Sequence, residues 1–123
     1  MMWKTLGLAV ALMTASIVPA LADSACMEPI APAAIDGGAA TKAQMTAAHA
    51  DVVTFLKQSD DYQVCLLREL TEEKAAAVKA KKDFDASIEA GVSAKVVANQ
   101  NLKEKVGGEY NAAVIAYKAK NPG

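Results

Sequence analysis

The two cysteines are the residues with the clearest chemistry in this sequence. Cys26 and Cys65 are its only cysteines, and they are far apart rather than in the C-x-x-C spacing of redox-active pairs. Two cysteines in an exported chain favour one structural disulfide over two free thiols. We therefore predict a disulfide between Cys26 and Cys65.

Two methionines and the only histidine offer a second kind of chemistry. Met45 and His49 lie four residues apart, on one face of a helix, and Met27 could approach them if the N-terminal part of the chain docks there. Methionine sulfur and imidazole nitrogen are suitable ligands for copper. The simpler interpretation is that Met45 is a core residue and that His49 flanks it. We adopt that interpretation and predict no metal site and no cofactor.

Catalytic motifs are absent from the sequence. There is no second histidine, no G-x-S-x-G motif and no glycine-rich phosphate loop. Asp60 and Asp61 are adjacent, so on a helix their carboxylates point about 100° apart and do not form a catalytic pair. Glu72 and Glu73 are related in the same way. These residues, with the lysines that follow them, indicate a solvated face of mixed charge, and we expect a protein that is not an enzyme.

Residues 1–22 have the composition of a cleavable export signal. Lys4 supplies the positive start, residues 6–18 form an almost uninterrupted apolar run without charge, and small residues precede a cleavage position after Ala22. The apolar run is shorter than the roughly 20 residues that a transmembrane helix needs, so we predict no membrane span after removal of the signal. The short signal is typical of bacteria. We therefore predict a periplasmic location, with secretion beyond the periplasm as the alternative.

Removal of the signal leaves one domain, residues 23–123. Without Lys4 the basic residues fall from 13 to 12 against 14 acidic residues, which is a formal charge of −2. The overall charge therefore does not attract nucleic acid or anionic lipid. No nucleic-acid partner is expected.

The segment before the first helix, residues 23–40, shows no helical periodicity, and we call it the leader. Pro29 and Pro32 remove backbone donors and favour an extended or polyproline-II conformation. Ile30 and Ile35 are expected to anchor the leader through apolar contacts. An Asp-Gly-Gly sequence near its end predicts a turn.

A long helix is predicted from residue 42. Thr41 and Gln44 have the spacing of a capping box, in which the two side chains satisfy backbone amides reciprocally. Small or apolar residues then alternate in steps of three and four, the heptad spacing typical of a coiled coil, at Met45, Ala48, Val52, Phe55, Ser59, Tyr62 and Leu66. Because neither glycine nor proline occurs between Thr41 and Gly91, we favour one helix over residues 42–90. The alternative is a break at Ser59-Asp60, which would give a three-helix bundle.

The second helix is predicted over residues 94–119. Gly91 is the expected C-terminal stop of the first helix, and Ser93 is the expected N-cap of the second. So short a connection makes the two helices antiparallel neighbours. The pair Gly107-Gly108 interrupts the second helix and indicates either a weak point or the close approach of another backbone.

Chain lengths decide how the leader reaches Cys65. Cys65 lies about 36 Å along a helix from Thr41, and the residues from Cys26 to Thr41 span roughly 50 Å when extended. The leader therefore reaches Cys65 if it runs back antiparallel along the first helix, over a stripe that the shorter second helix leaves without a partner. Wherever the leader leaves this stripe uncovered, we expect an interaction surface formed by Met45, Val52, Phe55, Tyr62 and Leu66.

Three short sequences resemble parts of small exported helical proteins of gram-negative bacteria. They are A-T-K-A-Q-M at residues 40–45, V-T-F at residues 53–55 and Y-Q-V-C-L at residues 62–66. In those proteins a leader rich in cysteine and proline likewise precedes a capped helix that carries Y-x-x-C-L. The resemblance implies export and the pairing of Cys26 with Cys65, and it transfers no active site.

The predicted fold is an all-α antiparallel hairpin of long helices, with an extended leader tethered by one disulfide. The predicted function is that of a non-catalytic exported interaction or accessory protein that acts through the apolar stripe. Its expected partner is a second copy, in a homodimer, or another periplasmic protein. The alternative is a periplasmic carrier of a small ligand or metal, which a pocket with convergent polar groups near Met45 and His49 would favour.

Overall fold

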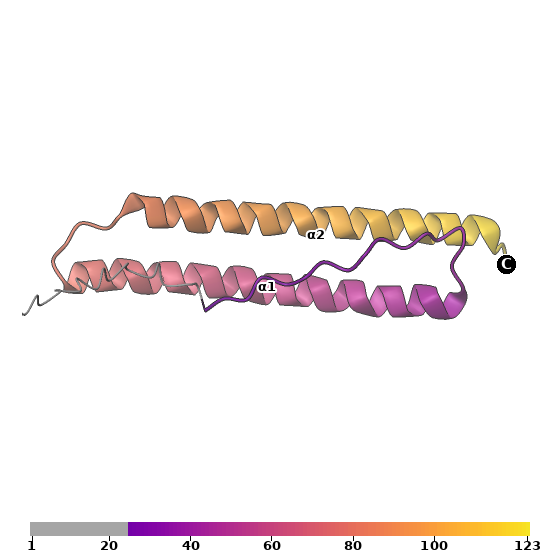
Figure 1. The fold of residues 1–123 in the computed structure, drawn as a ribbon, viewed down its shortest axis with the longest axis horizontal. Coiled ribbons are helices and arrows are strands. Elements are labelled where there is room, and N and C mark those ends of the chain that lie inside the picture. The colour runs from indigo at the N-terminus through magenta and orange to yellow at the C-terminus, as the bar shows by residue number, and fades with distance from the viewer. Residues whose placement is uncertain (1–24) are drawn as a thin grey trace, which may run out of the picture.

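Two antiparallel helices make up most of the structure. The computed structural model describes residues 25–123, so the predicted export signal and its cleavage position lie outside the described residues. Helix α1 spans Lys42–Lys79 and helix α2 spans Ala86–Lys120, and the two lie side by side (Figure 1). No strand occurs within residues 25–123. The predicted all-α hairpin is therefore confirmed.

Helix α1 begins where predicted because Thr41 caps it. Thr41 Oγ1 accepts a hydrogen bond from the Gln44 amide (3.1 Å), and Gln44 Oε1 accepts one from the Thr41 amide (2.9 Å). The helix then continues through Ser59-Asp60 without a break. Ser59 is fully buried, and its hydroxyl accepts a hydrogen bond from Asn99 Nδ2 of α2 (3.2 Å). The alternative of a three-helix bundle is wrong, because Ser59 lies in the contact between the helices and not in a turn.

The connection between the helices lies earlier in the chain than predicted. Helix α1 ends at Lys79, and Asp85 is the N-cap of α2. Asp85 Oδ1 accepts hydrogen bonds from the Ser87 amide (2.9 Å) and the Ser87 hydroxyl (2.7 Å). Four predictions are therefore wrong: the first helix over residues 42–90, the stop at Gly91, the cap at Ser93 and the second helix over residues 94–119.

The physical reason is a competition between helix signals. The Asp85 side chain satisfies an amide that a new helix would otherwise leave unpaired. Gly91, in contrast, costs a helix interior only about 1 kcal/mol relative to alanine, and the helix continues through it. The N-cap at Asp85, and not the glycine at residue 91, therefore determines where the second helix begins.

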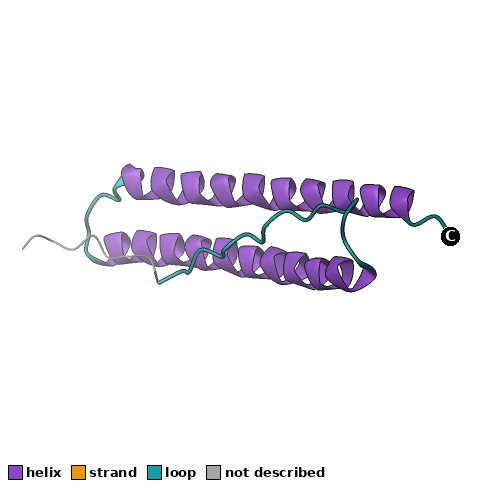
Figure 2. Ribbon diagram, turned by 45° about the vertical axis from the view of Figure 1, so that its right-hand side comes forward, coloured by secondary structure: helices purple, strands orange, loops and turns teal. Residues whose placement is uncertain are grey.

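The leader runs as an extended segment alongside the two helices (Figure 1, Figure 2). It begins near the middle of α1, where Cys26 forms a disulfide with Cys65 (Cα–Cα 5.7 Å). It then crosses obliquely to α2, which it meets at Gly37 against Ala113, and the chain returns from there to the start of α1. The predicted disulfide and the predicted antiparallel path of the leader are confirmed.

Side-chain packing, and not a backbone ladder, holds the middle of the leader. Residues 27–35 make no backbone hydrogen bond with any residue of the described chain. Ala31 packs against the cluster that contains Phe55 and Val106. Ile30, which was predicted to anchor the leader, is 90% exposed, so the prediction for Ile30 is wrong. The neighbouring Ala31 makes the apolar contact instead.

The turn at the end of the leader brings its backbone into contact with α2. Asp36 Oδ1 accepts a hydrogen bond from the Gly38 amide (2.9 Å), and the Asp36 carbonyl accepts one from the Ala39 amide (3.2 Å), so the predicted turn is confirmed. A Cβ on Gly37 would overlap the carbonyl oxygen of Ala113. The glycine therefore permits a close approach that no other residue allows.

The glycine pair in the second helix plays no such part. Gly107 and Gly108 lie inside α2, and no atom of a neighbouring segment lies within 4 Å of the position that a Cβ would occupy on either residue. The close approach of another backbone, one of the two interpretations of this pair, is wrong here. The leader makes that approach at Gly37.

Two apolar clusters form the interior, and each combines residues of α1, α2 and the leader. The first contains Cys26, Tyr62 and Leu66, with Val92 and Val96 packed against them. The second contains Val52, Phe55 and Val106, with Ala31 and Leu102 packed against them. The core is therefore built from three segments, the two helices and the leader.

A buried polar contact fixes the register of the two helices. Asn99, 1% exposed, donates from Nδ2 to Ser59 and accepts at Oδ1 from Gln63 Nε2 (2.8 Å). An ion pair between Lys103 and Asp60 lies beside it. No buried side-chain nitrogen or oxygen of the described residues lacks a hydrogen-bond partner. Because a buried polar group left without its partner costs roughly 1–3 kcal/mol, a shift of one helix along the other is strongly disfavoured.

Candidate ligand-binding cleft

The predicted interaction stripe lies in the interior. Its five residues are all buried, and Phe55 and Leu66 are each only 1% exposed. Since α1 ends early and α2 begins early, the two helices have similar lengths, and α2 covers the part of the stripe that was expected to lack a helical partner. In the folded chain Met45, Val52, Phe55, Tyr62 and Leu66 therefore belong to the core. A homodimer, or another periplasmic partner, stays a prediction.

The candidate metal ligands are not brought together. Met27 is 87% exposed and lies beside the disulfide with Tyr62, whereas Met45 is buried near the start of α1. Seventeen residues of helix separate Met45 from Tyr62, which is about 25 Å. His49 instead lies against Tyr110, with ring centroids 5.7 Å apart. Within the described residues, these three side chains do not form a common site.

One group of potential metal ligands occurs among the described residues, at the disulfide. The sulfurs of Cys26 and Cys65 and a carboxylate oxygen of Glu69 lie within 4.8 Å of one another. Metal ions bind cysteine as the thiolate, and both sulfurs are committed to the disulfide. Glu69 Oε1 also accepts a hydrogen bond from the Ala25 amide (3.0 Å). In the oxidised protein this group therefore ties down the start of the leader and is not a metal centre.

A hollow of about 490 Å³ opens beside the disulfide. The leader contributes Met27 and Ile30 to it, and α1 contributes Gln58 and Tyr62. Burial raises the pKa of the Tyr62 phenol, and the carboxylates of Glu28 and Glu69 raise it further. The phenol therefore stays neutral over the physiological range and supplies an O–H group to a wall of mixed apolar and polar side chains.

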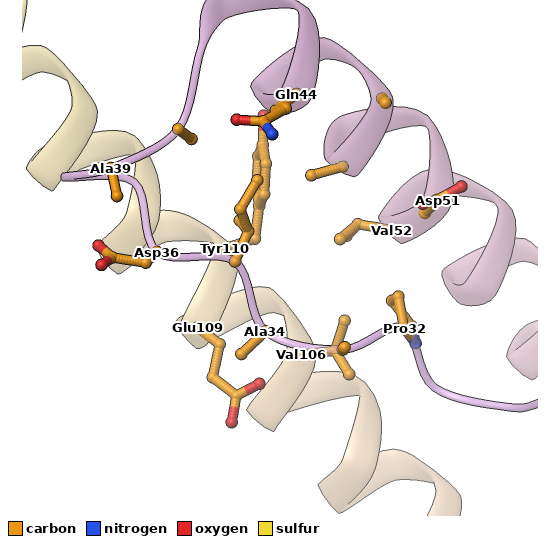
Figure 3. A pocket seen from close by; sticks show the side chains of 15 residues that line it. Pro32, Ala34, Asp36, Ala39, Gln44, Asp51, Val52, Val106, Glu109 and Tyr110 are labelled. Carbon is orange, nitrogen blue, oxygen red and sulfur yellow. The ribbon is translucent and has the colours of Figure 1, made fainter.

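A larger cleft, of about 590 Å³, lies where the leader crosses from α1 to α2. Figure 3 shows the leader passing between Val52 of α1 and Val106 of α2. Residues 32–36 of the leader form one side, the first turns of α1 form a second, and Glu109 and Tyr110 of α2 complete it. Two consecutive stretches of the chain, residues 32–40 and 44–52, and a distant part of α2 therefore frame a single space.

Small side chains explain why this space is not filled. Alanines occur in pairs on the facing segments: Ala33-Ala34 and Ala39-Ala40 in the leader, and Ala47-Ala48 in α1. The contact between Gly37 and α2 and the disulfide at the other end hold the leader in place. Because the leader is fixed at both ends and its side chains are short, it bridges the gap without closing it.

Carboxylates surround the cleft. Asp36, Asp51 and Glu109 line it, and none of the lining residues is a lysine, an arginine or a histidine. The side chain of Asp51 makes no hydrogen bond or ion pair with any residue of the described chain. Glu109 pairs with Lys105 at 3.5 Å on the exposed face of α2. The cleft therefore combines an apolar floor with a negatively charged rim.

Sequence reasoning missed these residues because they come from separate segments. Asp51 and Glu109 belong to no motif, and each reads as one more charge on a solvated helix face. The paired alanines were the available signal, since short side chains near the start of α1 and in the leader leave room for a ligand. Only the path of the leader shows that the pairs face the same space.

Comparisons with protein-family models, with curated proteins and with solved structures find no match. Neither helix of the described chain is long and apolar enough to cross a membrane. Interpretation of the function therefore depends on the geometry of the cleft and on the exposed groups around it.

Proposed function

We propose that the protein is a non-catalytic, exported binding protein that holds a small ligand in the cleft between its leader and its helical hairpin. The observation that carries this proposal is the cleft of about 590 Å³, framed by three segments and bordered by the carboxylates of Asp36, Asp51 and Glu109. Ligand sites are typically concave, about 300–1,000 Å³ in volume, mostly apolar and lined by a few polar groups. The cleft has each of these properties.

Burial of the apolar stripe favours this role over docking through the stripe. The side chains that were expected to meet a partner are committed to the core, and exposing them would require the hairpin to open. The cleft, in contrast, is open in the folded chain. It lies at the end of α1 that carries Met45 and His49, and Gln44 and Ala48, their immediate neighbours in the sequence, line it.

Export supports the same proposal. The disulfide between Cys26 and Cys65 is of the kind that persists in oxidising compartments such as the periplasm. A leader tethered in this way keeps the cleft assembled where the protein works. Intact-mass measurement of the protein recovered from a periplasmic extract tests the compartment: a chain that begins at Asp23 supports it, and a chain that retains residues 1–22 contradicts it.

A blocked cleft tests the ligand site. Ala47 lines the cleft, whereas Ala50 lies on the same helix outside it, so Ala47→Trp fills the space and Ala50→Trp is the matched control. We expect a screen of small metabolites to include compounds that raise the Tm of the wild-type protein and of Ala50→Trp by several degrees, with no rise for Ala47→Trp. The proposal is wrong if no compound raises the wild-type Tm, or if Ala47→Trp responds as fully as the control.

A further inference from the structure

Resting on the proposed function, we infer that the cleft takes a small organic cation: an ammonium group attached to an apolar body. Carboxylates stand on three sides of the cleft, Asp36 in the leader, Asp51 on α1 and Glu109 on α2 (Figure 3). The floor between them is apolar and includes Val52 and Val106. A ligand that complements this arrangement carries positive charge at one end and hydrocarbon at the other.

The spacing of the carboxylates selects an organic cation over a metal ion. Metal ions such as Ca²⁺ require several oxygens at about 2.3–2.6 Å from one centre. The cleft carboxylates do not converge in this way, because the one group of described residues whose potential ligand atoms lie within 4.8 Å of one another is at the disulfide. Figure 3 shows Asp36, Asp51 and Glu109 at different edges of the space. Such a distribution creates a broad negative potential, which suits an organic cation whose charged end meets the rim while its apolar body meets the floor.

The available partners identify Asp51 as the main anchor. Asp36 Oδ1 already accepts a hydrogen bond from the Gly38 amide in the turn, and Glu109 forms an ion pair with Lys105. Asp51 has neither kind of partner within residues 25–123. Tyr110, which lines the same cleft, adds an aromatic ring to the surface that receives the apolar body. An ammonium group near Asp51 therefore gains a full countercharge, and the apolar body lies over the valines.

Three probes of matched size show whether the cleft recognises the charge of a ligand or only its shape. Phenylethylammonium, phenylethanol and phenylacetate share an aromatic body and carry a cationic, a neutral and an anionic head. Titration of the exported, disulfide-bonded protein with each probe, followed by backbone amide chemical shifts, gives both the affinity and the location. We expect phenylethylammonium to bind at least fivefold more tightly than phenylethanol, and phenylacetate to bind more weakly than either. The shifts should concentrate at Ala47, Ala48, Val106 and Tyr110.

Charge-neutral variants test the anchor. Asp51→Asn is expected to weaken phenylethylammonium binding at least fivefold and to leave phenylethanol binding unchanged. Glu104→Gln removes one carboxylate from α2 outside the cleft, so it controls for the change in net charge and is expected to weaken binding less than twofold. Equal losses in the two variants would overturn the assignment of Asp51.

The outcomes separate this inference from the proposed function. If phenylethanol or phenylacetate binds in the cleft as tightly as phenylethylammonium, the cleft is a ligand site but the preference for a cation is wrong. The same conclusion follows if no probe binds while the metabolite screen finds neutral or anionic compounds that Ala47→Trp blocks. If neither the probes nor the screen finds a ligand, the inference and the proposed function are both wrong.

Discussion

At the scale of single residues, Gly37 determines how closely the leader approaches the hairpin. Its missing side chain allows backbone contact with Ala113, and this contact and the disulfide hold the two ends of the leader. The side chains between them are short, and the backbone of residues 27–35 makes no hydrogen bond within the described chain. The position of the leader therefore depends on a few residues.

Alanine substitution distinguishes this glycine from one without close neighbours. Gly37→Ala should lower the free energy of unfolding by about 1–3 kcal/mol, because the new Cβ overlaps a backbone carbonyl and the leader must shift. Gly91→Ala, at an open helical position, should raise that free energy by about 0.5–1 kcal/mol. Urea unfolding of both variants provides the measurement. A Gly37→Ala variant as stable as the wild type would show that the leader does not depend on this contact.

Sequence reasoning at this scale succeeded where a feature depends on residues close together in the sequence or has only one possible partner. With two cysteines, only one intramolecular disulfide is possible, and the capping box of Thr41 involves residues three apart. The glycines were harder, since Gly37 and Gly107-Gly108 differ only in what lies across from them in the fold. Asp51 and Glu109 could not be assigned to a site, because nothing near either residue indicates that the leader passes between them.

At the scale of elements, the N-cap of α2 determines the length of both helices. Hydrogen bonds from the Ser87 hydroxyl and the Ser87 amide lower the pKa of the Asp85 carboxyl. A lowered folded-state pKa means that Asp85 stabilises the fold at pH values above its unfolded-state pKa, near 3.9, and that this contribution is lost as the pH falls through the folded-state pKa. The start of α2 is therefore sensitive to acid.

A variant with an uncharged cap isolates this contribution. Asp85→Asn retains a capping oxygen but does not titrate, so its stability should fall less steeply than that of the wild type between about pH 5 and pH 2. Asp83→Asn removes a nearby carboxylate that caps no helix and should leave the wild-type slope unchanged. Thermal unfolding monitored by circular dichroism at several pH values measures both slopes. Parallel curves for Asp85→Asn and the wild type would contradict the role of the cap.

The helix boundary also explains why the stripe is buried, although an interaction surface was expected there. Heptad spacing correctly identified Met45, Val52, Phe55, Tyr62 and Leu66 as the apolar face of α1. Whether that face is covered depends on the length of α2. The length of α2 in turn depends on which of the possible stop and cap residues in the region 80–93 ends the first helix and begins the second. Spacing along one helix indicates which residues require burial, but not which segment buries them.

At the scale of the whole molecule, the leader turns a two-helix hairpin into a three-segment fold with a cleft. Each apolar cluster includes a leader residue, so the leader contributes to the core as well as covering it. In the loop-entropy account, a disulfide that closes a loop of about 40 residues contributes roughly 4 kcal/mol, against a typical domain stability of about 5–15 kcal/mol. The disulfide is therefore strong enough to decide whether the leader remains docked.

The central claim is that the disulfide holds the leader in place and thereby completes the ligand cleft. Titration of phenylethylammonium into the oxidised protein, and into the same protein reduced by a dithiol, tests this claim most directly. We predict that reduction weakens binding at least tenfold while circular dichroism shows the helix content of α1 and α2 largely retained. Equal affinity in the oxidised and reduced proteins, with the cleft residues shifting in both, would contradict it.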